Sequence, residues 1–190
     1  LSAEGLDSLM RVQNAATRMG RLISDLLAYS RVTMRAKPYE AVDLNAVLAE
    51  VLSDLEARIQ QSGARVTAGL LPTVEADRTQ MRQCLQNLVG NALKFHKPEE
   101  PPEVEIAATT EETGAGPQAV IAVRDRGIGF DPKFSERIFE VFQRLQGREE
   151  YEGSGIGLAV CRKIAQRHGG NVTAEGRPGE GATFTLRLPL

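Results

Sequence analysis

Residues Asn87–Phe95 read NLVGNALKF, and two glycine-rich stretches follow, DRGIG at Asp125–Gly129 and GSGIG at Gly153–Gly157. Each stretch alone is a weak signal, because alternating glycines occur in many turns. Their order carries more information: a helix with two asparagines, a turn with an acidic residue, and a glycine loop that leads into a helix. Since glycine lets a backbone approach a phosphate closely, we predict a nucleotide site built from these three segments.

A helix predicted over 77–95 carries a polar stripe separate from its apolar face. Asn87, Asn91 and Lys94 recur at i, i+4 and i+7, so they lie on one side of the helix. Asparagine is a poor helix former, so two of them in one helix need a reason. Amide oxygens suit a magnesium ion, and a lysine one turn further on suits a phosphate. Without the glycine stretches, a solvated polar stripe would be the better interpretation.

Asp125 ends a predicted strand and can accept a hydrogen bond from an exocyclic amine, such as the 6-amino group of adenine. Gly127 and Gly129 would let the backbone pass beneath a flat base without a side-chain clash. A simple Asp-Gly turn would explain this motif equally well if it stood alone.

The second glycine loop leads directly into a helix predicted over 156–168. Its amides can therefore face an anion at the helix N-terminus, and the preceding stretch, 130–155, is long enough to be a lid that hinges over a nucleotide. An apolar cluster at 138–145 lies in this stretch and includes Arg144, which could reach a phosphate. Such a cluster more often packs in a core; we expect it to do both, latching the lid to the domain or to a partner helix.

A long amphipathic helix is predicted over residues 3–31. Its apolar residues keep spacings of three and four for nearly three heptads: Leu9, Val12, Ala16, Met19, Ile23 and Leu26. Because one helix cannot bury such a stripe alone, it packs either on its own domain or in a bundle with a second chain, and the bundle is preferred. Pro38 disfavours helix at the residue before it, so 32–42 is expected to be a linker with a short strand at most.

Residues 43–190 are expected to form the main domain. Asp43 and Asp77 are predicted helix N-caps, the second as part of a capping box with Gln80, and Gly63 is a predicted helix end. Helices are predicted over 44–61, 77–95 and 156–168, and strands over 64–68, 73–75, 103–109, 118–125, 171–176 and 182–188. The predicted fold is α+β: a two-layer α/β sandwich with a mixed, mostly antiparallel sheet and helices on one face, preceded by the one long helix.

Composition narrows the class of function. The chain has 190 residues and a formal net charge of −2, which argues against a nucleic-acid partner. No apolar run approaches the roughly 18 residues of a membrane helix, so no direct membrane contact is expected. Cys84 and Cys161 fit buried thiols in a reducing cytoplasm. The first residue is not methionine, and we expect the chain to be a fragment of a longer, cytoplasmic protein.

Together the motifs resemble the catalytic ATP-binding domain of bacterial sensor histidine kinases, within the ATPase group that includes gyrase, Hsp90 and MutL. The matching stretches are the N box at 87–95, the glycine boxes at 125–129, 153–158 and 179–184, and the F box at 138–145. The helix end LLAYSR, at 26–31, resembles the second helix of the dimerisation and phosphotransfer hairpin. Residues 148–170 are most similar to kinases attached to phytochrome or PAS sensor modules.

The resemblance implies ATP and Mg2+ as cofactors and assigns roles to the polar stripe. Asn91 would coordinate magnesium with help from Asn87, while Lys94 and Arg144 would contact the phosphates. In the third glycine box, Ala182 stands where the family often has serine or threonine, which puts a water-mediated contact to adenine in doubt.

The remaining implied roles fall on the glycine boxes. Asp125 would read the adenine amine, with Gly127 and Gly129 shaping the base pocket. The residues that would close the lid over the triphosphate are Gly153, Gly155, Gly157 and, at the end of the same box, Leu158.

The resemblance also implies a division of the chain and a missing acceptor. Residues 1–31 would be the second helix of the hairpin, 32–42 a linker, and 43–190 the ATP-binding catalytic domain. The chain has two histidines, His96 and His168, and neither is followed by the acidic residue, leucine and arginine that mark the family's phosphoacceptor. We interpret them as a pocket-edge residue and a helix C-terminal residue, and we expect the acceptor to precede Leu1.

The predicted function is therefore the catalytic core of a two-component sensor histidine kinase. It would transfer the γ-phosphoryl group of ATP to a histidine outside this chain, and thence to an aspartate of a response-regulator receiver domain. The other implied partners are a second copy, through helix 3–31, and an upstream sensor module. A non-catalytic nucleotide-binding or dimerisation module and a regulator phosphatase stay open as alternatives. A serine kinase acting on a regulator is disfavoured by the F box and the Tyr29-Ser30-Arg31 helix end.

Overall fold

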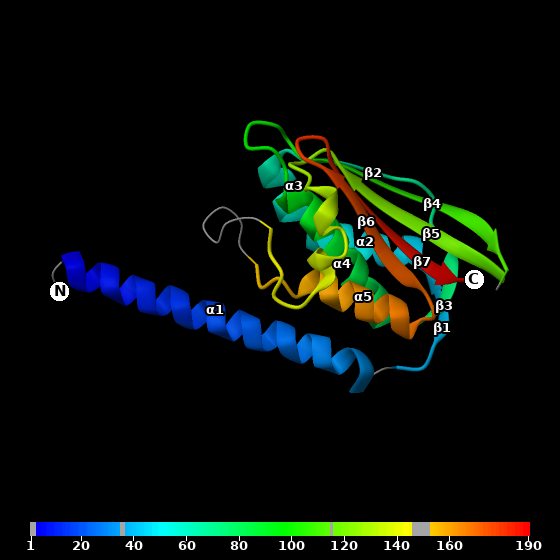
Figure 1. The fold of residues 1–190 in the computed structure, drawn as a ribbon, viewed down its shortest axis with the longest axis horizontal. Coiled ribbons are helices and arrows are strands. Elements are labelled where there is room, and N and C mark those ends of the chain that lie inside the picture. The colour runs from blue at the N-terminus through cyan, green and yellow to red at the C-terminus, as the bar shows by residue number, and fades with distance from the viewer. Residues whose placement is uncertain (1–2, 35–36, 115, 146–152) are drawn as a thin grey trace.

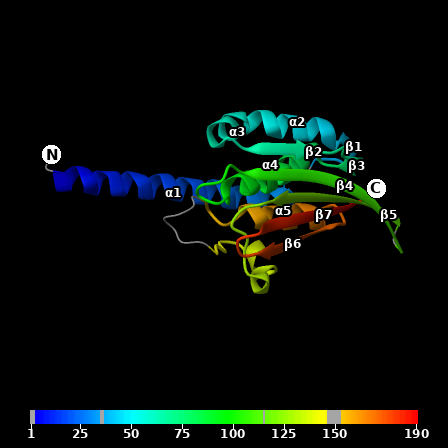
Figure 2. The ribbon, with the colours of Figure 1, turned by 90° about the horizontal axis from the view of Figure 1, so that it is seen from above.

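The computed structural model describes residues 3–34, 37–114, 116–145 and 153–190. The long N-terminal helix, α1 (Ala3–Met34), continues three residues past its predicted end, so the predicted linker over 32–42 begins inside the helix. Tertiary contact explains the extension, because the Val32 side chain is buried and its carbonyl accepts a hydrogen bond from Gln80. In Figures 1 and 2 the N-terminal part of α1 extends away from the rest of the molecule.

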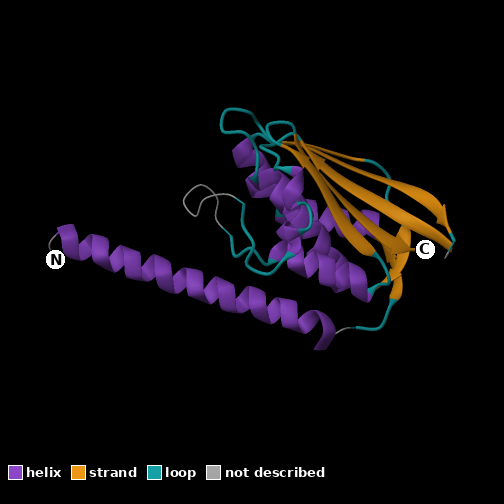
Figure 3. Ribbon diagram, in the orientation of Figure 1, coloured by secondary structure: helices purple, strands orange, loops and turns teal. Residues whose placement is uncertain are grey.

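The remaining elements form a two-layer sandwich with helices on one face of a five-stranded sheet (Figure 3). The helices of this layer are α2 (Leu44–Asp54), α4 (Arg78–Lys94) and α5 (Gly157–Arg167). The strands, in spatial order, are β2 (Arg65–Ala68), β4 (Glu103–Thr113), β5 (Gly116–Asp125), β7 (Gly181–Pro189) and β6 (Asn171–Arg177). Only the β2–β4 pair of this sheet is parallel. The predicted α+β sandwich with a mostly antiparallel sheet is confirmed.

Buried and exposed side chains alternate along the central strands, so one face of the sheet lies on the core and the other faces solvent. On β4, Val104 and Ile106 are buried while Glu105 between them is exposed, and Glu105 pairs across the sheet with Arg124 of β5 at 3.4 Å. Burying a large aliphatic side chain contributes roughly 1.5–3 kcal/mol. The apolar face of this sheet is therefore what holds the three covering helices.

A second, two-stranded sheet positions the starts of two helices. Strands β1 (Glu40–Asp43) and β3 (Thr73–Ala76) pair antiparallel. Asp43 at the end of β1 caps α2 by accepting from the Asn45 amide at 2.8 Å, and Asp77 after β3 caps α4 by accepting from the Thr79 amide at 3.0 Å. Both N-caps are as predicted, whereas the pairing of these two short strands was not predicted.

Two more boundaries differ from the sequence prediction. The helix predicted over 44–61 is two helices, α2 and α3 (Glu56–Ser62), because Leu55 leaves helical geometry with φ −93° and ψ 0°. It follows Ser53 and Asp54, residue types that compete for backbone hydrogen bonds in a helix. The loop predicted over 111–117 is shorter, because β4 and β5 pair as far as Thr113 and Gly116. Gly63 ends α3 in the left-handed conformation, as predicted.

The described part of the predicted lid begins with two short 3-10 helices, η1 (Pro132–Phe134) and η2 (Arg137–Phe139). Phe139 is buried, and Arg162 of α5 lies over its ring at 4.3 Å while pairing with Glu136 at 2.7 Å. The apolar cluster therefore packs on the domain at its start. Residues 146–152 of the predicted lid lie outside the described residues.

Two further predictions concern the helices. Cys84 and Cys161 are free thiols in the core, and the hydrogen bond to Cys84, together with burial, raises the pKa of Cys161.

Across the described ranges, α1 included, the helices lack the apolar run that crossing a bilayer would require.

Candidate functional site

A cavity of about 560 Å³ lies at the end of β5, between α4 and the start of α5. This volume is in the range of small-molecule pockets. Ten of the predicted site residues line it: Asn87, Asn91, Lys94, Asp125, Gly129, Arg144, Gly153, Gly155, Gly157 and Leu158. Gly127 is not among the described lining residues. The fold thus brings together segments that are far apart in the sequence, while the roles of these residues toward a ligand stay predictions.

Asp125 is the buried acid of the cavity. Its side chain ends strand β5 and is 6% exposed, and Oδ1 accepts hydrogen bonds from the amides of Gly127 at 2.9 Å and Ala182 at 3.2 Å. Burial raises the pKa of Asp125 to about 6, and the two amide hydrogen bonds oppose that rise. Because both bonds end on Oδ1, Oδ2 is the oxygen with which Asp125 can accept a bond from a molecule in the cavity.

The α4 stripe connects to the second glycine loop. The Asn87 amide nitrogen donates to the Gly157 carbonyl at 3.2 Å, so the side chain fixes the start of α5 relative to α4. Lys94 Nζ lies 4.3 Å from the centroid of the Phe95 ring, and a Cβ placed on Gly153 would come within 2.9 Å of that nitrogen. Asn91, half-buried, lies between Asn87 and Lys94 on the same wall. One wall of the cavity therefore offers amide groups and an ammonium group.

The glycines after Asp125 approach the backbone of the chain itself. A Cβ on Gly127 would lie 2.1 Å from the Phe95 carbonyl oxygen, and one on Gly129 would lie 1.9 Å from the Arg177 carbonyl oxygen. The Ile128 amide between them donates to Phe95 O at 2.9 Å. The close approach observed here clamps the turn between α4 and the β6–β7 hairpin, a reason for glycine that differs from the predicted clearance for a flat base.

Arg144 joins the two described ends of the lid region. Its Nη1 donates to the Gly153 carbonyl at 2.7 Å. Gly155 has a positive φ of 74°, and a Cβ there would lie 2.8 Å from the Gln143 carbonyl oxygen. The glycine loop therefore packs directly on residues 143–144, and Arg144 also lines the cavity.

Sequence reasoning missed several residues of this cavity. The Ala182 amide contacts Asp125, whereas the sequence drew attention only to its side chain. Asp25 and Ala28 of α1 line the same cavity, because α1 packs against α5, where Lys163 Nζ donates to the Tyr29 carbonyl at 3.1 Å. No local sequence pattern in α1 predicts this contact. The one available signal is that Asp25 is not part of the apolar stripe of the helix.

The two histidines are not among the described residues that line the cavity. His96 follows α4, and its Nδ1 lies 2.8 Å from the Lys97 carbonyl. His168 is buried at the end of α5.

Comparison with known proteins identifies the family. Residues 76–190 match the family model described as histidine kinase-, DNA gyrase B- and HSP90-like ATPase. The chain is 42% identical over 190 residues to cyanobacterial phytochrome A of Nostoc sp. strain PCC 7120, covering 100% of this chain and 24% of that protein. This chain therefore spans about a quarter of that relative's length.

Two solved structures share the fold. Full-length ShkA in complex with AMPPNP superposes with a TM-score of 0.75 at 29% identity, covering 100% of this chain and 39% of that one. A nucleotide-free catalytic domain of histidine kinase ThkA gives 0.66 at 27% identity, covering 80% of this chain and 97% of that one. Because the family model covers more than half of the residues, this chain belongs to the histidine kinase-, DNA gyrase B- and HSP90-like ATPases.

Proposed function

We propose that this chain is the ATP-binding catalytic core of a two-component sensor histidine kinase. It transfers the γ-phosphoryl group of ATP to a histidine outside the chain, from which the intact protein passes it to an aspartate of a receiver domain. The observation that carries the proposal is the convergence of Asp125, the α4 stripe and the second glycine loop on one cavity in a member of this ATPase family. The likeness to a histidine kinase catalytic domain and to a structure that holds AMPPNP supports the choice within the family.

Each wall of the cavity has a distinct task in this function. The Asp125 carboxylate accepts a hydrogen bond from the adenine amine through Oδ2, and Lys94 and Arg144 offset the charge of the phosphates. The glycine loop presents backbone amides at the start of α5. Transfer then depends mainly on positioning and on stabilising a loose transition state.

The donor set at this wall fits a magnesium ion. Asn91 and Asn87 offer amide oxygens, which are hard ligands of the kind that Mg2+ prefers. The Asn87 nitrogen already donates to Gly157, so its oxygen is the atom that can face the ion or one of its waters. A bound Mg2+ would neutralise charge on the phosphates.

The proposal assigns α1 to the second helix of a dimerisation and phosphotransfer hairpin, and 43–190 to the catalytic domain. The apolar stripe of α1 is largely exposed, and its exposed members are Leu9, Val12, Met19, Ile23 and Leu26. Covering this stripe requires another helix, and we propose a second copy of the chain as the partner. An upstream sensor module, as in the phytochrome relative, and a cytoplasmic location complete the proposal.

Phosphotransfer in trans tests the function. We expect the chain, incubated with Mg2+ and γ-labelled ATP, to bind ATP without labelling itself, and to label a separately supplied kinase hairpin that carries an acceptor histidine. Asn91→Ala should lower the rate about 100-fold or more, because it removes a magnesium ligand, whereas Asn171→Ala, exposed on β6, should leave the rate unchanged. Acid-labile phosphate on the isolated chain would contradict the proposal. ATP binding without transfer would favour the non-catalytic module.

The pH dependence of ATP binding follows from the raised pKa of Asp125. The ionised carboxylate is a stronger acceptor for an amine than the protonated acid, so with a pKa of about 6 affinity should rise by up to about tenfold between about pH 5 and pH 7. Stability has the opposite sign. The folded pKa of about 6 exceeds the unfolded value of about 3.8, so the native state binds more protons and loses stability as pH rises from about 4 to about 6. Calorimetry across pH measures the ATP affinity and the stability, and Asp125→Asn is the reference because it removes this titration. If affinity and stability changed with pH equally in both proteins, the prediction would be refuted.

A further inference from the structure

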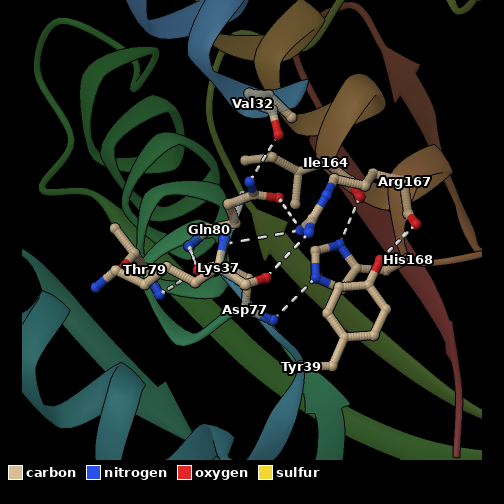
Figure 4. Close-up of polar contacts among 9 residues, drawn as sticks. All are labelled: Val32, Lys37, Tyr39, Asp77, Thr79, Gln80, Ile164, Arg167 and His168. Carbon is tan, nitrogen blue, oxygen red and sulfur yellow. Dashed lines mark hydrogen bonds and ion pairs between the residues drawn. The ribbon is translucent and has the colours of Figure 1, made fainter. Parts of the chain in front are cut away.

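A polar cluster outside the nucleotide cavity, three of whose members are buried, connects α1 and the segment after it to the ATP-binding domain (Figure 4). The cluster consists of Tyr39, Asp77, Gln80, Arg167 and His168. Asp77, Gln80 and His168 are each at most 6% exposed. Buried polar groups of this kind are costly unless each is paired, so what they pair with is informative.

Two of these side chains hold the backbone on either side of residues 35–36. Gln80 Nε2 donates to the Val32 carbonyl of α1 at 2.8 Å. Asp77 Oδ2 accepts from the Lys37 amide at 2.8 Å. Both contacts reach main-chain atoms, so they attach the end of α1 and the segment that begins at Lys37 to the domain.

Arg167 lies at the centre of the cluster and connects these two contacts. Its Nη1 donates to Gln80 Oε1 at 3.0 Å and lies 3.7 Å from Asp77 Oδ2. Its Nη2 donates to the Lys37 carbonyl at 3.1 Å. One guanidinium group from the end of α5 thus contacts both holding side chains and the segment that they hold, as Figure 4 shows.

His168 completes the cluster and explains why the predicted capping box is only half formed. The Asp77 amide donates to His168 Nε2 at 3.1 Å instead of to the Gln80 side chain, which leaves Gln80 able to reach α1. The Nδ1 of His168 lies 2.8 Å from the Ile164 carbonyl, so the ring is neutral with its proton on Nδ1. Burial lowers the pKa of His168, which favours that form.

Tyr39 closes the cluster from the segment side. Its ring stacks on His168 with centroids 4.7 Å apart, and its hydroxyl donates to the Arg167 carbonyl at 2.6 Å. Of the α1 side chains that the structure describes, only Val32 is buried. Tyr29 also packs against the core but is only partly buried, so polar contacts contribute to the attachment of α1 beside the apolar ones.

We infer that this cluster is a joint that sets the direction of α1 relative to the ATP-binding domain, with Gln80 and Arg167 as its positioning residues. Hydrogen bonds have strict directions, so a network that ends on main-chain atoms selects one orientation where a few apolar contacts would permit many. Under the proposed function, the joint determines where the phosphotransfer hairpin stands relative to bound ATP.

Spin-label distances in the 190-residue chain test the joint. Gln13→Cys on α1 and Glu111→Cys on β4 are exposed, whereas the native thiols are buried and escape labelling. Dilution with unlabelled chain suppresses distances between copies. We expect one narrow distance distribution in the parent, and at least a twofold broader one in Gln80→Met and in Arg167→Met.

A matched control and an affinity measurement separate positioning from folding. Arg162→Met removes another arginine of α5, which pairs with Glu136 rather than with the α1 segment, so the distribution should stay narrow. The ATP dissociation constant of Gln80→Met and Arg167→Met should stay within about twofold of the parent value, because neither residue lines the cavity among the residues that the structure describes. Unchanged distributions in both variants, a broad distribution in the parent, or lost ATP binding in the variants would each overturn the joint. None of these outcomes depends on phosphotransfer, so the proposed function is tested separately.

Discussion

Replacing Asp125 by asparagine is expected to weaken ATP binding about 100-fold while leaving the fold at least as stable. The substitution is expected to lower ATP affinity but not stability, because the carboxylate that it replaces is a buried charge. Asparagine keeps an oxygen for the Gly127 and Ala182 amides but places an NH2 donor where Oδ2 would accept from the adenine amine. A lost charge-assisted bond and two opposed donors cost about 2–3 kcal/mol, while removing a buried charge favours the fold.

Calorimetry with Mg-ATP and thermal unfolding without nucleotide measure the two effects. The matched control is Asp131→Asn, because Asp131 caps η1 and asparagine caps nearly as well. This variant should bind ATP as the parent does. If Asp125→Asn kept full affinity, Asp125 could not be the residue that reads the base. If instead it unfolded, the carboxylate would be structural.

Gly129→Ala is expected to destabilise the protein by about 3 kcal/mol or more. The Cβ would meet the Arg177 carbonyl oxygen at 1.9 Å and the Gly181 carbonyl oxygen at 2.7 Å. These are backbone atoms of the β6–β7 hairpin, which cannot yield as a flexible side chain does. The turn after Asp125 would therefore have to separate from the sheet. The part of the nucleotide cavity that Asp125 and this turn line, where the base is proposed to bind, would then be disrupted.

Gly179→Ala is the matched control, because it isolates backbone strain from the clash. Gly179 has φ of 77°, close to the 61° of Gly129, yet a Cβ there meets nothing within 4 Å. Only the left-handed conformation opposes alanine, which costs about 1–2 kcal/mol. Urea unfolding of both variants gives the comparison. Equal losses would show that strain, and not the close approach, is why Gly129 is glycine.

The sequence predicted those features that depend on neighbouring residues. The caps at Asp43 and Asp77 and the end at Gly63 follow from local hydrogen bonding and φ preference, and the structure has all three. The polar stripe of α4 follows from helical spacing in the same way, since residues three and four apart share a face. Local rules of this kind place each site segment on its own element.

The sequence did not predict contacts between distant segments. Strands β1 and β3 have four residues each and pair although α2, α3 and β2 lie between them in the sequence. Strands this short have no sequence pattern that identifies the strand they pair with. The capping box at Asp77 has the expected residues, yet His168, 91 positions away, takes the amide that Gln80 was predicted to bind. The close approaches of glycines 127 and 129 depend on distant segments, because Gly127 approaches Phe95 after α4 and Gly129 approaches Arg177 and Gly181 of the β6–β7 hairpin.

The placement of the polar cluster at one end of α1 has a mechanical consequence. Tyr29 and Val32, whose carbonyls bond to the domain, lie near the C-terminal end of the helix. From Tyr29 back to Ala3 is about 26 residues, or about 40 Å at the helical rise of 1.5 Å per residue. A pivot of about 10° there would sweep the far tip through about 7 Å, so a long helix of this geometry acts as a lever that amplifies a small rearrangement of side chains.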